Sequence, residues 1–216
     1  MKIAAFIGSG NKNGNTARII KQILAGSESK GATWEIFNLC DYNIKPCTGC
    51  RCCEKTNVCN ITNDDISVLH KAIVEDDAFI LGSPTYYGDI SGVFKQFIDR
   101  CYPFGTQSIN KETRESSFGS ILTKRKLGIL VATSGGMGPE VFERHSAVAH
   151  HCFNDINALY WRKLLVPYTT YEPVTKDHLI MEEAFDLGVE LVTVHKTGEL
   201  GSGIVFEHKY DMNTEE

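Results

Sequence analysis

The chain concentrates thiols in residues 47–59, CTGCRCCEKTNVC, which hold five of its eight cysteines. Cysteines at such short spacing form a disulfide staple, a metal site or a redox centre. Four of the five follow the pattern Cys47-x2-Cys50-x2-Cys53-x5-Cys59, and Cys52 is extra. Four thiolates in one loop can surround a single iron–sulfur cube, as a C-x2-C-x2-C run does in bacterial ferredoxins. Structural zinc usually takes two cysteine pairs about 12–20 residues apart, a separation that this segment lacks.

Composition limits the partners and the compartment. The chain has 216 residues, 42% of them hydrophobic and 23% charged, which suits one α/β domain with its own core. Its net charge of −5 argues against nucleic acid and anionic membranes as partners, and no run resembles a signal peptide or a membrane helix. We therefore expect a cytoplasmic protein, in which clustered cysteines indicate metal or redox chemistry more often than disulfides.

A polar segment, GSGNKNGNT at residues 8–16, follows the apolar run KIAAFI. It fails the G-x-G-x-x-G and P-loop patterns, because Asn13 replaces a required glycine when either is counted from Gly8, and Asn15 breaks a P-loop counted from Gly10. The N–H groups of a following helix would still suit the terminal phosphate of a mononucleotide. The side chains that can add hydrogen bonds are Ser9, Asn11, Asn15 and Thr16. An ordinary polar turn with a helix cap is the alternative.

Two more loops of this kind follow apolar runs. Residues 83–91, SPTYYGDIS, place Tyr86 and Tyr87 at the tip of a tight turn, where a flat ring needs a wall. Residues 132–136, ATSGG, contain glycines that let the backbone approach a ligand closely. Taken alone, the tyrosines fit surface packing equally well. The three loops together favour a bound cofactor at one edge of a sheet.

The elements that position these loops alternate along the chain. Apolar runs predict strands at 2–7, 33–39, 77–82, 127–132 and 163–166. Helical periodicity predicts helices at 19–24, 63–73 (capped by Asn63 or Asp64), 93–101, 139–156 and 177–197. Five strands separated by helices indicate a doubly wound parallel sheet, covered on both faces, with ligands at the carboxyl ends of its strands. Residues 103–126 read as a polar excursion.

The three loops also resemble a known family. GSGNKNGNT, SPTYYGDISGVFKQFIDR and VATSGG closely resemble the NADPH-dependent FMN reductase family of flavodoxin-like proteins, and the cysteine pattern is similar to the compact motif of its iron–sulfur flavoprotein branch. The resemblance covers about residues 1–170 and implies strand order 2-1-3-4-5, with FMN where that order reverses. It implies phosphate contacts from Ser9, Asn11, Asn15 and Thr16. It implies ribityl and ring contacts from Pro84, Thr85, Tyr86, Tyr87, Gly88, Thr133, Ser134 and Gly135.

One departure concerns the phosphate. Many relatives carry an arginine near it, where this chain has Asn11 and Lys12. Neutral donors would then contribute more of the phosphate binding.

The cysteine loop at 46–60 follows the second strand. Loops after parallel strands emerge at one edge, so we expect these thiols one or two strands from the flavin, at about 4.8 Å per strand. The expected ligands of a [4Fe–4S] cluster are Cys47, Cys50, Cys53 and Cys59. Cys52 is the spare, because using it would leave one residue between neighbouring ligands. A cluster-free thiol loop, a zinc site and a disulfide remain alternatives.

Other chemistry-bearing residues are expected to be structural. The histidines after Pro139 lack the i, i+4 spacing of a metal-binding helix; they are His145, His150 and His151. The cysteines outside the loop are expected to be packing residues: Cys40, Cys101 and Cys152. An exposed ion-pair face is expected from Lys95, Asp99 and Arg100. Because a flavin performs its own redox chemistry, no catalytic side chain is expected.

These observations predict an FMN- and [4Fe–4S]-containing oxidoreductase. It would pass electrons between a small-molecule acceptor and either a one-electron carrier such as a ferredoxin or NAD(P)H. The alternatives are a cluster-free NAD(P)H-dependent FMN or quinone reductase and a zinc-stabilised FMN-binding module. We expect one domain over 1–197 and a tail over 198–216. The long additions at 103–126 and in the tail, with the family resemblance, predict a homodimer or homotetramer.

Overall fold

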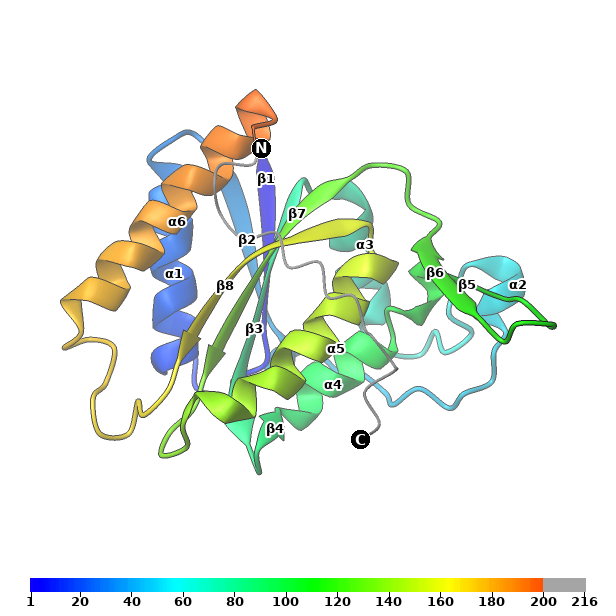
Figure 1. Ribbon diagram of the computed structural model, residues 1–216, viewed down its shortest axis with the longest axis horizontal. Helices are drawn as coiled ribbons and strands as arrows, with labels where there is room; N and C mark the ends of the chain where they lie inside the picture. Colours follow the sequence, from blue (N-terminus) through cyan, green and yellow to red (C-terminus); the bar gives the residue numbers. More distant parts are fainter. Residues whose placement is uncertain (200–216) are drawn as a thin grey trace.

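A parallel sheet with strand order β2-β1-β3-β7-β8 forms the centre of the computed structural model, which describes residues 1–199 (Figure 1). The strands are β1 (Lys2–Ile7), β2 (Thr33–Asn38), β3 (Ala78–Tyr86), β7 (Lys126–Thr133) and β8 (Ala158–Val166). This confirms the predicted doubly wound class and the order 2-1-3-4-5. The last strand begins earlier than predicted, because its first half alternates buried and half-buried side chains instead of forming an apolar run.

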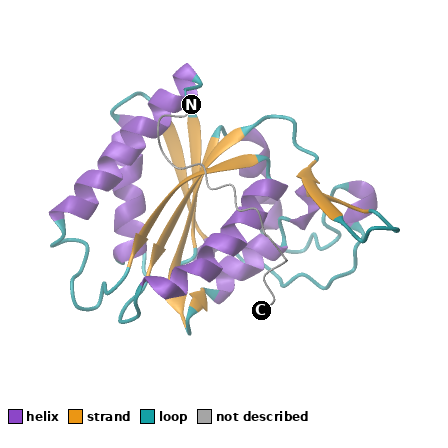
Figure 2. Cartoon of the chain, in the orientation of Figure 1, coloured by secondary structure: helices purple, strands orange, loops and turns teal. Residues whose placement is uncertain are grey.

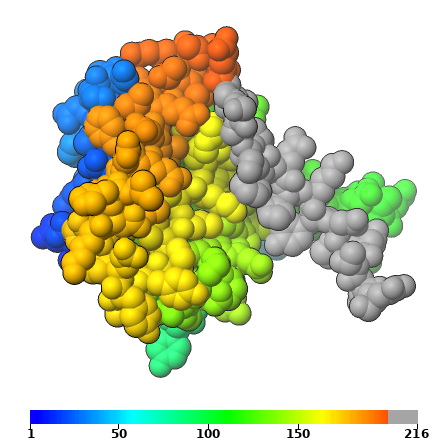
Figure 3. All heavy atoms as spheres, turned by 60° about the vertical axis from the view of Figure 1, so that its left-hand side comes forward, coloured from blue at the N-terminus to red at the C-terminus, as the bar shows by residue number. Residues whose placement is uncertain are grey.

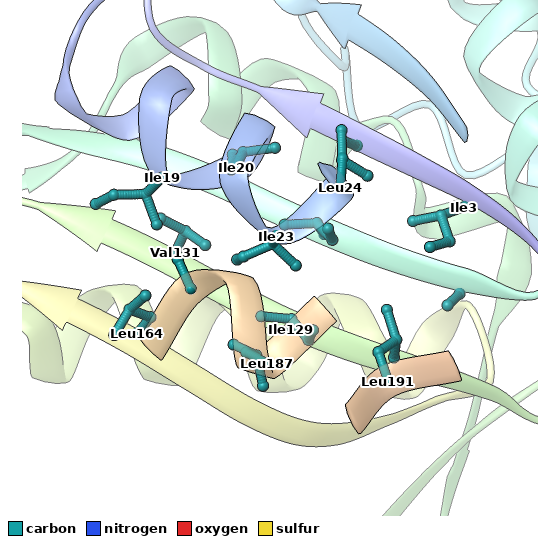
Figure 4. Close-up of a cluster of buried hydrophobic side chains, with 14 of the residues drawn as sticks. Ile3, Ile19, Ile20, Ile23, Leu24, Ile129, Val131, Leu164, Leu187 and Leu191 are labelled. Carbon is teal, nitrogen blue, oxygen red and sulfur yellow. The ribbon is translucent and has the colours of Figure 1, made fainter. Parts of the chain in front are cut away.

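Helices cover both faces of the sheet (Figure 2). One face carries α1 (Asn15–Glu28) and α6 (His178–Thr197). Their apolar side chains meet those of the strands in one core, in which Ile23 and Leu187 lie near Ile129 (Figure 4). The two helices approach closely at two glycines: a Cβ added at Gly188 would lie 1.9 Å from the Ile23 carbonyl oxygen. Backbone proximity of this kind requires residues without side chains.

The opposite face carries α3 (Ile66–Glu75), α4 (Gly92–Asp99) and α5 (Phe142–Asp155). Alternate residues of β1 serve the two cores, since Ile3 belongs to the first core and Phe6 to the second. Phe6 stacks on Phe37 and on Phe97 of α4, with ring centroids 5.1 and 4.6 Å away. This alternation is what a strand buried on both sides produces.

The connections contain short elements that the apolar pattern did not predict. They are the 3-10 turns η1 (Leu39–Asp41), η2 (Tyr102–Phe104) and η3 (Pro139–Val141), helix α2 (Cys53–Thr56), strand β4 (Asp89–Ile90) and the strands β5 (Gly105–Ile109) and β6 (Ser116–Ser120). Within residues 1–199, strands β5 and β6 pair only with each other. They form a hairpin (Figure 1) that projects from the body of the molecule (Figure 3). Their side chains are mostly exposed and polar, so no apolar run marked them within the predicted excursion.

Helix α6 ends at Thr197 and is capped by Gly198, whose φ of +73° is the left-handed conformation typical of a helix C-terminus. The predicted tail lies outside the described residues beyond Glu199. Within residues 1–199, no helix combines the length and the apolar character that crossing a membrane requires.

Candidate functional site

The carboxyl ends of β1, β3 and β7 bring the three predicted cofactor loops together. The backbone N–H of Gly8 donates to the Gly82 carbonyl at 2.8 Å, and the Ser91 hydroxyl donates to the Gly8 carbonyl at 2.6 Å. The Thr16 and Thr133 hydroxyls lie 2.7 Å apart. The first loop is therefore bonded to both of the others, as predicted.

The first loop presents backbone donors at the start of α1. No side chain of residues 1–199 caps this helix, and its N-cap position is the extended Gly14. The N–H groups of its first turn point out of the helix and lack intrahelical acceptors. Ser9 is buried and hydrogen bonds Asn11, whereas the Asn11 side chain is exposed. Thr16 is buried against Thr133.

The second loop is a two-residue hairpin between β3 and β4. Tyr87 and Gly88 have φ values of +53° and +74°, and Tyr86 pairs with Asp89. Two positive φ values at the centre are those of a type I′ turn. The hairpin holds Tyr86 half exposed and Tyr87 fully exposed, so both aromatic rings are available to a ligand.

The third loop is fixed by a segment that sequence reasoning missed. The Ser134 N–H donates to the Val166 carbonyl at 3.1 Å, and Thr169 donates through both its N–H and its hydroxyl to the Ser134 carbonyl. A Cβ at Gly135 would lie 2.7 Å from the Thr170 hydroxyl. The segment after β8 thus closes this edge of the sheet. Its residues show no apolar periodicity, so the sequence did not predict this role.

The sequence also did not indicate that His145 lies beside the second cofactor loop. It is fully buried, with Nε2 3.3 Å from the Thr85 hydroxyl and Nδ1 3.2 Å from the Val141 carbonyl oxygen. Burial lowers its pKa, so the neutral ring is favoured beside the second loop. Its contact with the Thr85 hydroxyl holds the side chain of Thr85 in place.

The cysteine loop leaves the sheet beside the first cofactor loop. The Lys12 ammonium and the Asp41 carboxylate lie 2.6 Å apart there, and Cys40 is exposed instead of packed, contrary to expectation. The chain then runs to the far ends of α4 and α5. Four cysteines of the loop line a cavity of about 530 Å³ at this place, together with Asp99, Arg100, Tyr102, Cys152 and Asp155 of the helix ends. These four are Cys47, Cys50, Cys53 and Cys59; among the described residues that line the cavity, Cys52 does not occur.

The expectation that the thiols share an edge with the cofactor loops was wrong. Those loops lie where α4 and α5 begin, whereas the cavity is lined by Asp99 and Asp155, the last residues of these helices. From His145 to Asp155 the helix rises about 15 Å. Figure 1 shows α2 beside β5 and β6, away from the arrowheads of the strands. The cysteine loop is long enough to leave the carboxyl edge of the sheet. The strand order determines only where this loop starts, not where its cysteines lie.

The thiols of the cavity affect one another electrostatically. Burial raises the pKa of Cys53, and the neighbouring Cys59, Cys50 and Cys47 raise it further. Hydrogen bonding from the Cys52 backbone lowers the pKa of Cys50. Several thiolates placed together repel one another, and a bound cation would relieve this repulsion. In residues 1–199, no three His, Cys, Asp or Glu side chains are grouped closely enough to hold a single metal ion.

Beside these thiols, Arg100 differs from its expected exposed position. Its side chain is buried and its guanidinium lies 2.5 Å from the Asp64 carboxylate. Lys95 and Asp99 do form the expected exposed pair, also at 2.5 Å. The predicted exposed ion-pair face therefore consists of Lys95 and Asp99 and does not include Arg100.

The remaining packing predictions are mostly confirmed. Cys101 and Cys152 are buried as expected, and their thiols interact; burial raises the pKa of Cys101 well above its usual value. Helix α3 begins after Asp65 at the N-cap, one residue later than predicted. The predicted cap Asp64 still accepts from the Ile66 N–H at 3.3 Å and also binds Arg100.

Comparison with known proteins supports the resemblance on which the cofactor residues rest. The model of the family described as NADPH-dependent FMN reductase matches residues 1–155. An iron-sulfur flavoprotein of Methanocaldococcus jannaschii is 35% identical over 113 residues, which cover 51% of this chain and 58% of that protein. One from Archaeoglobus fulgidus is 35% identical over 135 residues, covering 62% and 60%. The matched region thus spans about 60% of these relatives.

Solved structures share the fold at low sequence identity. A flavone reductase has a TM-score of 0.64 and 16% identity, covering 91% of this chain and 64% of its own. An FMN-dependent NADH-azoreductase of Bacillus anthracis, in complex with FMN, has a TM-score of 0.61 and 15% identity, covering 89% of this chain and all of its own.

Proposed function

Because the chain belongs to the NADPH-dependent FMN reductase family, we propose that it is an FMN-dependent oxidoreductase that also holds a [4Fe–4S] cluster. The observation that carries the proposal is the cysteine cavity: the four cysteines of the 2-2-5 spacing line it, and Cys52 does not. The two curated relatives described above are named iron-sulfur flavoproteins.

FMN would lie across the three loops at the carboxyl ends of the strands. Its phosphate would receive hydrogen bonds from the uncapped first turn of α1, which offers oriented N–H groups and the positive end of a helix dipole. Tyr86 and Tyr87 would lie against the ring, and Thr133, Ser134 and Gly135 would close its other side. When bound, the flavin supplies the redox chemistry, and the protein residues bind and orient it.

The cluster would be bound by Cys47, Cys50, Cys53 and Cys59, which line a common cavity. A cube offers four iron atoms, and each takes one thiolate. Burial and the neighbouring cysteines raise the pKa of Cys53, so ionised thiolates together in this cavity are unfavourable unless a positively charged iron–sulfur core offsets their repulsion. A cysteine-rich site of this kind belongs in a reducing compartment such as the cytoplasm.

Electrons would pass between a one-electron carrier such as a ferredoxin, or NAD(P)H, and a small-molecule acceptor. The length of α5 separates the cofactor loops from the cysteine cavity within one chain. Direct transfer between the two centres would therefore be favoured by assembly of two or more copies, which places the cavity of one copy near the cofactor loops of another.

Iron, acid-labile sulfide and flavin content of the anaerobically purified protein tests this function. We expect about four irons and four sulfides per FMN. Replacing Cys47, Cys50, Cys53 or Cys59 by serine should lower bound iron and bleach visible absorbance outside the flavin bands. Cys52→Ser is the matched control and should leave both unchanged. FMN without iron, together with NAD(P)H oxidation by a quinone, would instead identify a cluster-free reductase.

A further inference from the structure

A buried guanidinium lies directly behind the cysteine loop. Arg100 follows the last residue of α4, its side chain is fully buried, and it lines the cysteine cavity. We propose that Arg100, held by Asp64, is a positioning residue of the metal centre, which closes the cysteine loop and supplies positive charge and a hydrogen-bond donor to the sulfur of Cys59 or of a bound cluster. This inference rests on the proposed function.

The guanidinium joins the two ends of the loop. Nη1 donates to the Lys45 carbonyl at 2.7 Å, two residues before Cys47, and Nη2 donates to the Ile61 carbonyl at 2.9 Å, two residues after Cys59. One planar group therefore fixes the distance between the entry and the exit of the ligand segment. Fixing that distance in advance lowers the conformational entropy that metal binding would otherwise have to overcome.

Asp64 orients this group. Its two carboxylate oxygens accept from Nη1 at 2.5 Å and from Nη2 at 3.3 Å, and one of them also accepts from the Lys45 N–H at 2.9 Å. The two-pronged arrangement is specific to arginine, because lysine offers a single ammonium. Hydrogen bonding to Asp64 keeps the guanidinium charged despite its burial.

The third nitrogen lacks an acceptor. Arg100 Nε is buried and has no hydrogen-bond partner in residues 1–199, which is a costly state for a donor of a charged group. The Cys59 sulfur interacts with this guanidinium and raises its pKa further. An anionic sulfur in the cavity is thus the acceptor that the guanidinium lacks, and hydrogen bonds to sulfur and local charge both set the reduction potential of iron–sulfur clusters.

Three variants test the inference in the full-length protein. In Arg100→Met, we expect less iron per FMN after anaerobic reconstitution and a more negative cluster potential in an EPR-monitored redox titration, because a positive charge that stabilises the reduced state is lost. In Asp64→Asn, the potential should move in the opposite direction, because the cation loses its neutralising partner. Lys95→Met, which removes an exposed charge from the same helix, should resemble the wild type.

Protease digestion provides a readout that needs no cluster. Arg51 and Lys55 are exposed trypsin sites inside the loop. In the iron-free protein, Arg100→Met and Arg100→Lys should both be cleaved at these sites several-fold faster than the wild type. Neither side chain can make the paired guanidinium hydrogen bonds that hold the two ends of the loop together. FMN content should stay unchanged, since the cofactor loops lie at the other end of α4.

Three outcomes would overturn the inference: wild-type iron content, potential and cleavage in Arg100→Met; potential shifts of the same sign in Arg100→Met and Asp64→Asn; or equal losses of iron and FMN. The last result would mean that the ion pair only maintains the fold. Absence of iron from the wild type would refute the proposed function instead, and the cleavage experiment would still show whether Arg100 closes the loop.

Discussion

Thr16 shows how one side chain can serve both the fold and the cofactor. Its hydroxyl lies 2.7 Å from that of Thr133, so the first and third cofactor loops meet through two buried hydroxyls. Each hydroxyl can donate one hydrogen bond and accept two. One of the pair can therefore donate to the other while the second proton remains available to FMN.

Replacing Thr16 by valine tests this arrangement. Valine has nearly the same shape, so the change removes the hydroxyl alone, and a hydrogen bond to a charged phosphate is worth roughly 1.5–3 kcal/mol. We expect FMN affinity to fall by about ten-fold or more, measured by fluorescence titration of the flavin-free protein. Thr16→Ser, which keeps the hydroxyl, is the control. Equal affinities in wild type and Thr16→Val would exclude Thr16 from the phosphate contacts.

Asp155 adds a pH dependence near the cysteine cavity. Burial raises its pKa from 3.8 to about 6. Its folded-state pKa lies above its unfolded value, so the associated stability is present below about pH 4 and is lost as the pH rises through about 6. At neutral pH the half-buried carboxylate is charged and destabilises the protein. Its partial exposure reduces this effect to about 1–2 kcal/mol.

Asp155→Asn should therefore stabilise the cluster-free protein by about 1–2 kcal/mol at pH 7.5 and by much less at pH 4.5. Urea unfolding at the two pH values measures the difference. A constant stability difference for Asp155→Asn at both pH values would contradict the assignment of this raised pKa.

At the scale of elements, the sheet could be predicted and the excursions from it could not. The five parallel strands follow apolar runs because both of their faces are buried, and their order follows from the family resemblance. Strands β5 and β6 are exposed and polar, so burial imposed no pattern on residues such as Gln107 and Ser117. The same reason applies to the segment around Thr169, which closes the third cofactor loop by hydrogen bonds.

For the cysteine loop, likewise, the local spacing of residues could be predicted from the sequence, whereas contacts between distant residues could not. The 2-2-5 spacing predicted Cys47, Cys50, Cys53 and Cys59 as cluster ligands, and these four line the cavity whereas Cys52 is not among its described lining residues. The position of the loop in the fold depends on the ion pair between Arg100 and Asp64, which are 36 residues apart in the chain. Arg100 was therefore placed on an exposed face, because periodicity does not reveal a partner at such a separation.

The contact between α1 and α6 depends on the two glycines that face it. A Cβ at Gly188 would meet the Ile23 carbonyl oxygen at 1.9 Å, and one at Gly26 would meet the Phe185 carbonyl oxygen at 2.0 Å. Gly188→Ala should therefore force the helices apart and lower the free energy of unfolding by about 1–3 kcal/mol. Chemical denaturation measures this loss.

Gly92→Ala is the matched control for that change, because nothing lies within 4 Å of its added Cβ. It should change stability by less than about 0.5 kcal/mol. A similarly small effect of Gly188→Ala would mean that the two helices can separate without cost.

At the scale of the whole molecule, the cofactor loops and the cysteine cavity lie at opposite ends of α4 and α5. The cofactor loops occupy the carboxyl edge of the sheet, and the cysteine cavity is lined by Asp99 and Asp155, the last residues of α4 and α5. Helix α2, which begins at the cavity residue Cys53, lies beside β5 and β6 (Figure 1). The hairpin exposes Ile109 and Phe118, which are 56% and 55% accessible. A two-stranded hairpin gains stability when its apolar side chains are covered.

We therefore expect a homodimer or homotetramer in which the hairpin lies in an interface. Sedimentation equilibrium at micromolar concentration should give two or four times the chain mass. Introducing charge at the hairpin, in Ile109→Asp/Phe118→Asp, should shift the protein toward monomer, because burying a carboxylate in an apolar contact is unfavourable. Leu179→Asp, at an exposed apolar position on α6, is the control and should keep the assembly. A monomeric wild type would refute the assembly, and an intact oligomer in the double variant would exclude the hairpin from its interface.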